Sequence, residues 1–310
     1  MERRQFIIGG LVALASFNEI GRSYYSPIDY GPSFRDSTEL GSSYQADSLK
    51  IKTGTWNLAA YLFNRKFENS LRFRIKYAGK SISNLVPVPD IVGFQEVFGG
   101  SRRRIVDSLK GTKLKFGHYF PSNFFGSGLF VMSAFPIIKT EFHQFSKQGN
   151  PLEFETSDFY AGKGICLTRV ETGIGVFDFY NTHCHGKYSL RRVSLSKKDR
   201  RKHKKIRISQ RYEITDFINE HSPENLFICV GDFNCDLGSD EYIEFMDDAP
   251  FRRIMGDVNS GKDHIFVTKN DKFEIDFIGL DKTPERWGGN GPRISDHDGY
   301  YSSVMIRKIS

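Results

Sequence analysis

The feature that most constrains the fold is a series of short apolar segments that recurs from residue 50 to the C-terminus. The segments are rich in β-branched and aromatic residues and are bounded by Gly, Pro, Asn or Asp, which is typical of β-strands. Strands that alternate first with helices and then with one another predict a layered α/β domain, with helices covering two packed sheets. We expect strands at 50–58, 91–97, 127–133, 164–170, 174–182, 226–232, 264–268, 273–279 and 301–307, and helices at about 66–84, 101–110, 204–221 and 239–247.

Polar side chains follow several predicted strands at the point where each strand ends. Asn57 ends TGTWNLA, Glu96 follows Gln95 in PDIVGFQEV, and Asp232 and Asn234 follow the apolar run LFICVG. Each residue alone could be a turn residue, a helix-start acid or a cap. Together they indicate a site that is built from strand ends.

Two segments near the C-terminus add charged residues to this set. Asp296 and His297 come just before the last predicted strand, in RISDHDGYYSSVMI. Asp276 lies inside the otherwise apolar segment FEIDFIGL. A carboxylate there is costly unless it is paired or hydrogen-bonded, so we expect Asp276 to have a partner.

As a set, the motifs GDFN and SDH, with WN and QE upstream, resemble those of the endonuclease/exonuclease/phosphatase superfamily, also called the DNase-I-like fold. The resemblance covers roughly residues 50–308. It implies a four-layer α/β-sandwich, in which two packed mixed sheets are flanked by helices. We place this catalytic domain at residues 49–310.

The resemblance implies that a Mg²⁺ ion assists attack of water on a phosphodiester, with Mn²⁺ or Co²⁺ as alternative ions. Glu96 and the amide oxygen of Asn57 would bind the ion, because Mg²⁺ takes oxygen ligands, and Asp296 would support the metal side. His297 would be the general base, and Asp276 would hydrogen-bond His297 and fix its tautomer.

Three other residues would act on the nucleophile and the phosphate. The resemblance implies that Asp232 and Asn234 position both groups. His183 would donate to a non-bridging phosphate oxygen, where negative charge builds in the transition state.

Several segments resemble the neutral sphingomyelinases of this superfamily more than its nucleases. These are GSGLFVMSAFPI at 126–137, YAGKG at 160–164 and NTHCHGKY at 181–188. The last resembles Thr-His-x-His-Ala-Glu-Tyr, but Gly186 and Lys187 stand where the family has Ala and Glu. The family's R-x-x-Q-x-x-E-x-x-x-F spacing is kept at 207–217, although helix packing alone would also produce it.

Lys163 lies in the AGKG motif, for which two interpretations remain open. The resemblance places this lysine close to the phosphate as a substrate-binding residue, and Asp158 could pair with it as a switch. The alternative is a turn before a strand. A nucleotide-binding loop is not indicated, because the leading Gly and the Ser or Thr after Lys are missing.

NTHCHGKY also sets two histidines on either side of a cysteine. In an extended segment His183 and His185 face one side and Cys184 the other, so the three cannot easily share one metal ion. His185 is either a substrate-side partner of His183 or a marker of the branch. The four cysteines form no C-x-x-C pair and are expected to be buried thiols, with a bridge between Cys184 and Cys235 left open.

The charge of the chain favours anionic partners, since 44 Lys and Arg exceed 37 Asp and Glu by 7. The stretch 187–207 holds 11 Lys or Arg and one Asp. It is either a solvated insertion or helix start, or a contact for anionic, phosphate-bearing surfaces.

The N-terminus is separate from the fold. MERRQFIIGGLVALASF has a basic head with paired arginines and an apolar run too short to span a bilayer. We predict an export signal of twin-arginine or Sec type at 1–21, an irregular leader at 22–48, and a periplasmic or secreted mature protein without a transmembrane segment. The alternative is an uncleaved, disordered tail.

The predicted function is Mg²⁺-dependent hydrolysis of sphingomyelin to ceramide and phosphocholine. The predicted partner is sphingomyelin or another phosphodiester at a membrane surface. The first alternative is an extracellular nuclease. Nucleic acid is expected as a partner only under this alternative. Weaker alternatives are a phosphoinositide phosphatase and a catalytically silent binder of anionic surfaces. Candidates for contact with choline or lipid are Phe124, Phe125, Tyr160 and Trp287.

Overall fold

The computed structural model describes residues 46–60, 69–122, 126–149, 161–187, 196–247 and 249–309. Several sequence predictions lie outside these residues: the export signal, nearly all of the leader, residues 188–195 of the basic stretch, Phe124, Phe125, Asp158 and Tyr160.

The described strands form two mixed sheets of six strands each. The first sheet has the order β11-β12-β1-β2-β4-β3, and its strands are Phe273–Thr283, Gly299–Lys308, Ser48–Ala60, Ile91–Val97, Phe130–Ser133 and Phe116–Tyr119. The second has the order β5-β6-β7-β8-β10-β9, with strands Ile137–Gln144, Gly164–Thr172, Gly175–His183, Phe227–Asp232, Asp263–Thr268 and Phe251–Arg253. Each sheet contains one parallel pair, β1 with β2 and β7 with β8.

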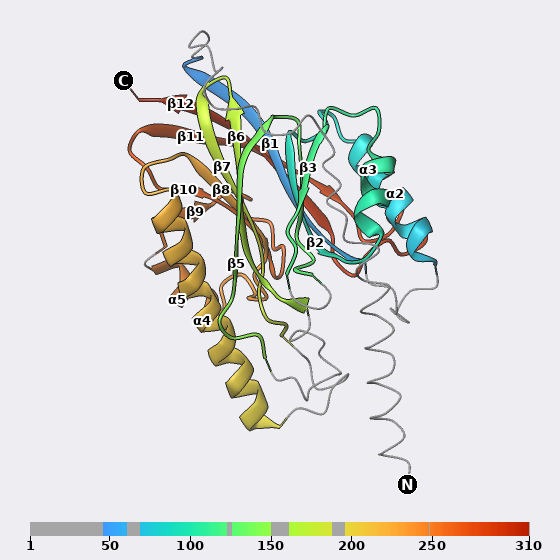
Figure 1. Ribbon diagram of the computed structural model, residues 1–310, viewed down its shortest axis with the longest axis vertical. Coiled ribbons are helices and arrows are strands. Elements are labelled where there is room, and N and C mark those ends of the chain that lie inside the picture. The colour runs from blue at the N-terminus through green and yellow to red at the C-terminus, as the bar shows by residue number, and fades with distance from the viewer. Residues whose placement is uncertain are drawn as a thin grey trace.

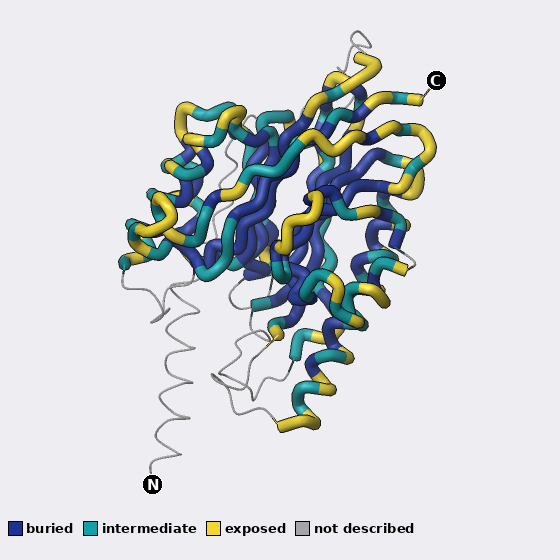
Figure 2. The backbone as a smooth tube through the Cα atoms, turned by 180° about the vertical axis from the view of Figure 1, so that it is seen from behind, coloured by how far each residue is buried: buried dark blue, intermediate teal, exposed yellow. Residues whose placement is uncertain are grey.

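Three apolar clusters show that the architecture has four layers. The first lies between the sheets and combines residues of both, such as Val131 and Ile306 with Phe179 and Val230. The second lies between the first sheet and helices α2 (Leu71–Ser83) and α3 (Ser101–Ser108). The third lies between the second sheet and helices α4 (Lys197–His221) and α5 (Asp240–Asp247). Figure 1 shows the two helix pairs on opposite sides, and Figure 2 shows the buried strands between them.

A polar contact crosses the centre of the apolar interface between the sheets. Gln95 Nε2 of β2 donates to Asn181 Oδ1 of β7 at 2.6 Å, and Asn181 Nδ2 donates to the Phe94 carbonyl at 3.0 Å. The contact requires Gly93, because a Cβ there would lie 2.8 Å from Asn181 Cγ. It fixes β2 against β7, the strands that lead to Glu96 and His183.

The four-layer sandwich expected from the sequence is confirmed. The strands that sequence analysis missed are β3, β5 and β9, and all three lie at sheet edges. Edge strands are half exposed and therefore tolerate polar residues, so their hydrophobic pattern is weak. No helix among the described residues is both long and apolar enough to span a membrane.

Helix α4 begins earlier than expected, at Lys197 instead of residue 204. Ser196 and Asp199 form a capping box, in which each side chain bonds to the other residue's backbone N–H. The basic stretch therefore continues into a regular helix, and eight Lys or Arg lie within its first eleven residues.

Candidate active site

Strand pairing brings the predicted polar residues to one edge of the sandwich. Asn57 is paired with Gln95 in the parallel β1–β2 ladder, so Glu96 follows at the same edge. His183 is paired with Asp232 in the parallel β7–β8 ladder. The carboxyl ends of these four strands therefore supply the site, as the sequence predicted.

Asn57 joins the two sheets through its side-chain amide. Its Nδ2 donates to Glu96 Oε1 and to Asp232 Oδ2, both at 3.1 Å, while its Oδ1 accepts from the Ala59 backbone N–H at 3.0 Å. This geometry therefore does not support the prediction that the Asn57 side-chain oxygen is a metal ligand, because that oxygen accepts from a backbone N–H. The donor end of the amide faces the carboxylates because two neighbouring negative groups favour a donor between them.

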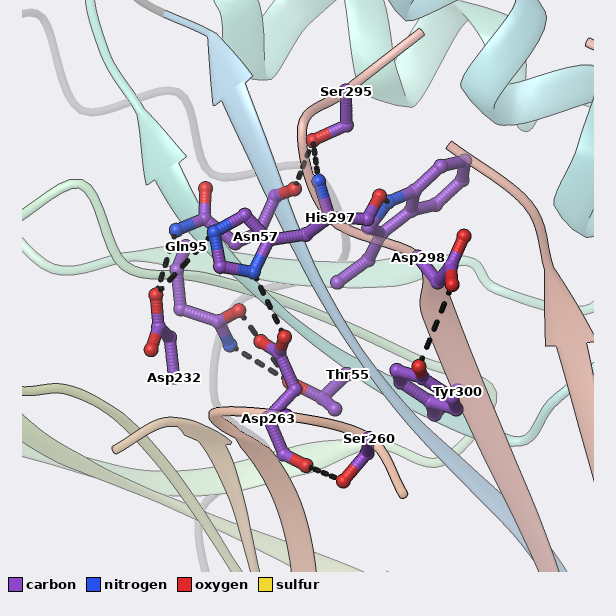
Figure 3. A network of polar contacts seen from close by, with 12 residues as sticks. Thr55, Asn57, Gln95, Asp232, Ser260, Asp263, Ser295, His297, Asp298 and Tyr300 are labelled. Atoms are coloured by element: carbon purple, nitrogen blue, oxygen red, sulfur yellow. Dashed lines mark hydrogen bonds and ion pairs between the residues drawn. The ribbon is translucent and has the colours of Figure 1, made fainter. Parts of the chain in front are cut away.

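His297 is held by an aspartate that sequence analysis did not single out. Its Nδ1 lies 2.8 Å from Asp263 Oδ2, at the start of β10, and its Nε2 lies 3.7 Å from Asp232 Oδ2. Figure 3 shows the ring directed toward Asp263, with Asn57 and Asp232 beside it. The Trp56 indole N–H donates to the His297 carbonyl at 2.9 Å and fixes the backbone of this loop.

The prediction that Asp276 orients His297 is wrong. Asp276 lies on the outward face of the edge strand β11, where it is exposed and pairs with Arg307. Its register partner Met305 is six positions along β12 from Gly299, which is near His297. The register therefore places Asp276 about 20 Å from the strand end that carries the site.

Asp263 had a signal in the sequence that could have found it. It stands directly before the apolar segment HIFVT, so it marks the start of a strand rather than the end of one. Because β10 runs antiparallel to β8, the start of β10 lies at the same edge as the end of β8, and Asp263 is paired with Asp232. Where a strand ends at a site, its antiparallel neighbour begins there, so the first residue of that neighbour is also a candidate site residue.

His183 and Lys163 form a second polar pair, on the side of Glu96 and Asp232. Lys163 is buried, and its Nζ lies 3.0 Å from His183 Nε2 and 2.9 Å from the Cys184 carbonyl. A lysine ammonium only donates, so His183 Nε2 accepts in this arrangement. His183 Nε2 also lies 3.6 Å from Asp232 Oδ2 and 3.9 Å from Glu96 Oε1. Lys163 therefore lies beside His183, directly before β6 begins at Gly164, and its role as a substrate-binding residue stays a prediction.

Asn234 holds together the two loops that follow β7 and β8. Its Nδ2 donates to the Cys184 carbonyl at 2.9 Å, its Oδ1 accepts from the Lys187 backbone N–H at 3.2 Å, and its own N–H donates to Asp232 Oδ1 at 3.0 Å. Its φ of 50° lies in the left-handed region, which Asn tolerates better than most residues.

Cys184 and His185 leave the strand after His183. Cys184 is buried in the third cluster, as predicted, and all four cysteines carry free thiols. His185 is fully buried, its backbone N–H donates to Gln210 Oε1 at 2.7 Å, and its ring packs against His203 of α4. His185 is therefore not placed to touch substrate, and the sequence prediction of that role is wrong, because strand alternation ends at His183.

Burial raises the pKa of Glu96 to about 7, and the negative charge of Asp296 adds to the rise. The Glu96 side chain is 21 % exposed, but its Oε2 is buried and has no hydrogen-bond partner among the described residues. The φ of Glu96 is 56°, a conformation that non-glycine residues rarely adopt. Such backbone strain is characteristic of functional sites.

Asp232, Asp263 and His297 form a cluster of charges that shift one another's pKa. Burial raises the pKa of Asp232, but His297 and His183 outweigh it and hold that pKa well below its usual range. Burial lowers the pKa of His297, but Asp263 and Asp232 outweigh it and raise the pKa to about 10. His297 is therefore the member of the cluster that carries positive charge at neutral pH.

The residues present suit a hard divalent cation. Glu96 Oε2 and Asp263 Oδ1 are buried acceptors without hydrogen-bond partners among the described residues. In that part of the chain, single ligand atoms of Asp232, Asp263 and His297 also lie within 4.8 Å of one another. Carboxylate oxygens are the ligands that Mg²⁺ prefers, and unpaired buried acceptors are costly without a positive partner.

Comparison with known proteins agrees with this geometry. Residues 54–297 match the sequence profile described as the Endonuclease/Exonuclease/phosphatase family. The chain belongs to this family. The matched range begins just before Asn57 and ends at His297, so it contains every residue of the site described above.

One relative is a Drosophila melanogaster protein provisionally named neutral sphingomyelinase, 28% identical over 245 residues, which cover 71% of this chain and 54% of the relative. Another is sphingomyelin phosphodiesterase 2 of Rattus norvegicus, 32% identical over 125 residues, 39% of this chain and 28% of the relative. The chain thus matches about half or less of the length of these relatives.

A variant of beta toxin from Staphylococcus aureus, crystallised with bound magnesium ions, has a similar fold, with a TM-score of 0.63 and 16% identity. The similarity covers 82% of this chain and 99% of the toxin. The DNase-I-like fold class predicted from the sequence is therefore confirmed.

Proposed function

We propose that this protein is a Mg²⁺-dependent phosphodiesterase that hydrolyses sphingomyelin to ceramide and phosphocholine. The observation that carries the proposal is the His297–Asp263 pair, in a site where Asp263 and Glu96 each keep a buried oxygen without a hydrogen-bond partner among the described residues, in a chain related to named sphingomyelinases. Mn²⁺ or Co²⁺ are alternative ions for the same oxygen-rich site.

His297 would take the proton from the attacking water. In the neutral ring Nδ1–H donates a hydrogen bond to Asp263 Oδ2, so the Nε2 lone pair faces the site. A bound Mg²⁺ would polarise the phosphate oxygens and offset the carboxylate charge that raises the pKa of His297. Glu96 would be its principal ligand, with Asp296 beside it, since Asp296 is close enough to raise the pKa of Glu96.

The remaining residues would hold the phosphate and its neighbours in place. Lys163 supplies a buried positive charge beside His183, where a phosphate oxygen that gains charge in the transition state would be stabilised. His183 donates from Nε2 only after Lys163 turns to the phosphate, or when its ring is protonated. Asn234 fixes the Asp232 carboxylate through its own N–H and so orients the nucleophile side.

The test is release of phosphocholine from sphingomyelin in detergent micelles, measured with Mg²⁺ and after its removal by chelation. Phosphatidylcholine, plasmid DNA and inositol phosphates complete the panel, and a His297→Ala protein is the matched control. We expect sphingomyelin turnover that needs the ion and His297. Turnover of DNA without phosphocholine release would overturn the substrate assignment and leave the site chemistry intact.

A nuclease is the second candidate, and the basic first half of α4 is the observation that favours it. Phosphate contacts dominate nucleic-acid affinity and make it steeply salt-dependent. Under the leading proposal the same helix contacts an anionic membrane surface. We also propose that the protein is exported, because of the basic, twin-arginine-like head and short apolar run of its first residues.

A further inference from the structure

The first half of α4 projects beyond the edge of the sandwich that carries the active site. The 25 residues of α4 span about 37 Å, whereas the six residues of β8 span about 20 Å. The two elements are joined by a short connection at 222–226 and run in opposite directions, so their joined ends lie together. About eleven residues of α4, 197–207, must therefore extend past Asp232, and Figure 1 shows this overhang beyond the end of β7.

Basic side chains line one face of the overhang at helical spacing. Lys197, Arg200, Arg201 and Lys204 follow the i, i+3, i+4, i+7 pattern and line a groove of about 430 Å³. Like charges at this spacing repel one another and destabilise a helix. An anion in the groove would remove that repulsion.

The floor of the groove is a built contact rather than a mobile surface. Arg207 is only 4 % exposed, and its Nε and Nη2 donate to both oxygens of Glu241 at 3.0 and 2.9 Å. Glu241 is also held by Arg211 at 2.9 Å. Glu241 is the one carboxylate among the described residues that line the groove. It is thus already engaged by two arginines, and the basic face keeps a positive excess.

The opposite wall of the groove belongs to the catalytic loops. Arg207 Nη1 donates to the Gly186 carbonyl at 3.2 Å, and Lys187, whose side chain also lines the groove, donates its backbone N–H to Asn234 Oδ1. Lys187 also pairs with Asp236. The groove and the active site therefore share one loop and face the same end of the molecule.

We infer that this groove binds the phosphate of an anionic lipid and thereby holds the active-site end of the domain against a bilayer. The inference extends the proposed function by naming the surface at which the substrate is met. A lipid phosphate suits the position, because the groove opens beside the site that must meet a lipid. The described residues that line the groove include no Phe, Tyr or Trp, so they offer no platform for the base stacking used for single-stranded nucleic acid.

The experiment measures sedimentation of the full chain with phosphatidylcholine vesicles, with and without an equal share of phosphatidylglycerol, and without any sphingolipid. This readout does not require turnover, so it can fail or succeed independently of the proposed activity. The test variant carries three substitutions in one protein, Arg200→Gln, Arg201→Gln and Lys204→Gln, and thermal melting checks that it is folded. Each basic side chain at an anionic surface contributes about fivefold to partitioning, so we expect a loss of about 100-fold.

Two matched controls separate a discrete groove from general attraction. Lys202 and Lys205 of α4 line a second groove together with Lys147 of the loop after β5, and replacement of these three by Gln removes the same charge from the other flank of α4. Lys50, Lys269 and Lys308 lie far from the site edge and serve as the distant set. We expect losses below tenfold for the first set and below threefold for the second.

Three results would overturn the inference. Equal losses for the two flanks of α4 would show delocalised attraction without a discrete groove. Full release by inorganic phosphate, at an ionic strength matched with chloride, would show a site for free anions instead of lipid. Tighter binding to duplex DNA than to the anionic vesicles would assign the groove to nucleic acid.

Discussion

The two ends of the sandwich treat buried carboxylates in opposite ways. At the far end, Asp178 near the start of β7 is fully buried and satisfied by the Arg169 guanidinium at 2.6 and 2.8 Å, by Asn225 at 2.9 Å and by Ser222. At the site end, Glu96 and Asp263 each keep a buried oxygen without a hydrogen-bond partner among the described residues.

Hydrogen-bond satisfaction therefore distinguishes a structural carboxylate from a functional one in this fold. Both ends lie on the same sheets, so burial alone does not distinguish them. A buried acceptor without a donor costs free energy, and among the described residues the carboxylates that carry this cost lie at the end where a cation and a phosphate would supply the missing partners.

The largest effect should come from His297→Ala. The His297–Asp263 pair is the only His–carboxylate contact at or below 3 Å among the described residues of the site, and the ring is the only candidate base with its partner in place. We expect sphingomyelin turnover per folded molecule to fall about 10³-fold, with thermal melting as the check that the variant is folded. A variant that keeps more than a tenth of the parent's turnover would show that another group is the base.

A paired substitution would sharpen the comparison of the two ends. Glu96→Gln should lower turnover by about 100-fold or more while the free energy of unfolding stays the same or rises, because a buried charge is removed. Asp178→Asn should lower the free energy of unfolding by about 3 kcal/mol, because Arg169 loses its partner, and leave turnover per folded molecule unchanged.

Denaturant unfolding and initial rates on the same preparations measure both quantities. If Glu96→Gln destabilises the protein as strongly as Asp178→Asn does, the distinction between a functional Glu96 and a structural Asp178 is contradicted.

Acid should weaken a satisfied carboxylate contact in a defined pH window. Burial raises the pKa of Glu241, but Arg207 and Arg211 outweigh it and lower the pKa to about 2. A depressed carboxyl pKa gives stability that is present above the unfolded value near 4.5 and is lost as pH falls through the folded value. We expect Glu241 to contribute roughly 2 kcal/mol at pH 6 and progressively less between pH 4.5 and 2.

Unfolding free energies of the parent and of Glu241→Gln across this pH range measure that contribution. Curves that stay parallel from pH 6 to pH 2.5 would contradict the assignment.

The smallest effect should come from Asp276→Asn. Asp276 is exposed and pairs with Arg307 on an edge strand, and exposed pairs contribute little. We expect turnover within twofold of the parent and a change in unfolding free energy below about 0.5 kcal/mol. A 100-fold loss of turnover would restore Asp276 as the partner of His297.

The elements and most site residues could be predicted because they follow strongly apolar strands. The apolar segments that lead to Asp232 and to Glu96 are short and almost continuously hydrophobic, as is typical of buried strands. The edge strands β3, β5 and β9 lack this pattern because almost none of their residues is fully buried.

The partner of His297 could not be assigned without the sheet register. Asp276 looked costly because its neighbours are apolar, but alternation on an edge strand turns it to solvent. Asp263 looked ordinary before a strand, and only the antiparallel pairing of β10 with β8 brings it opposite Asp232. The orientation of the Asn57 amide likewise depends on contacts from three strands.

Calorimetric titration of Mg²⁺ into the parent protein and into Glu96→Gln tests most directly whether Glu96 and Asp263, the carboxylates with unpartnered buried oxygens, belong to a cation site. Because the pKa of Glu96 is about 7 before the ion binds, binding at pH 7 should release protons, and the affinity should fall as pH is lowered. We expect saturable binding with proton release in the parent, and weakening of at least about tenfold in Glu96→Gln. Equal binding by both proteins, or none by the parent, would contradict this expectation.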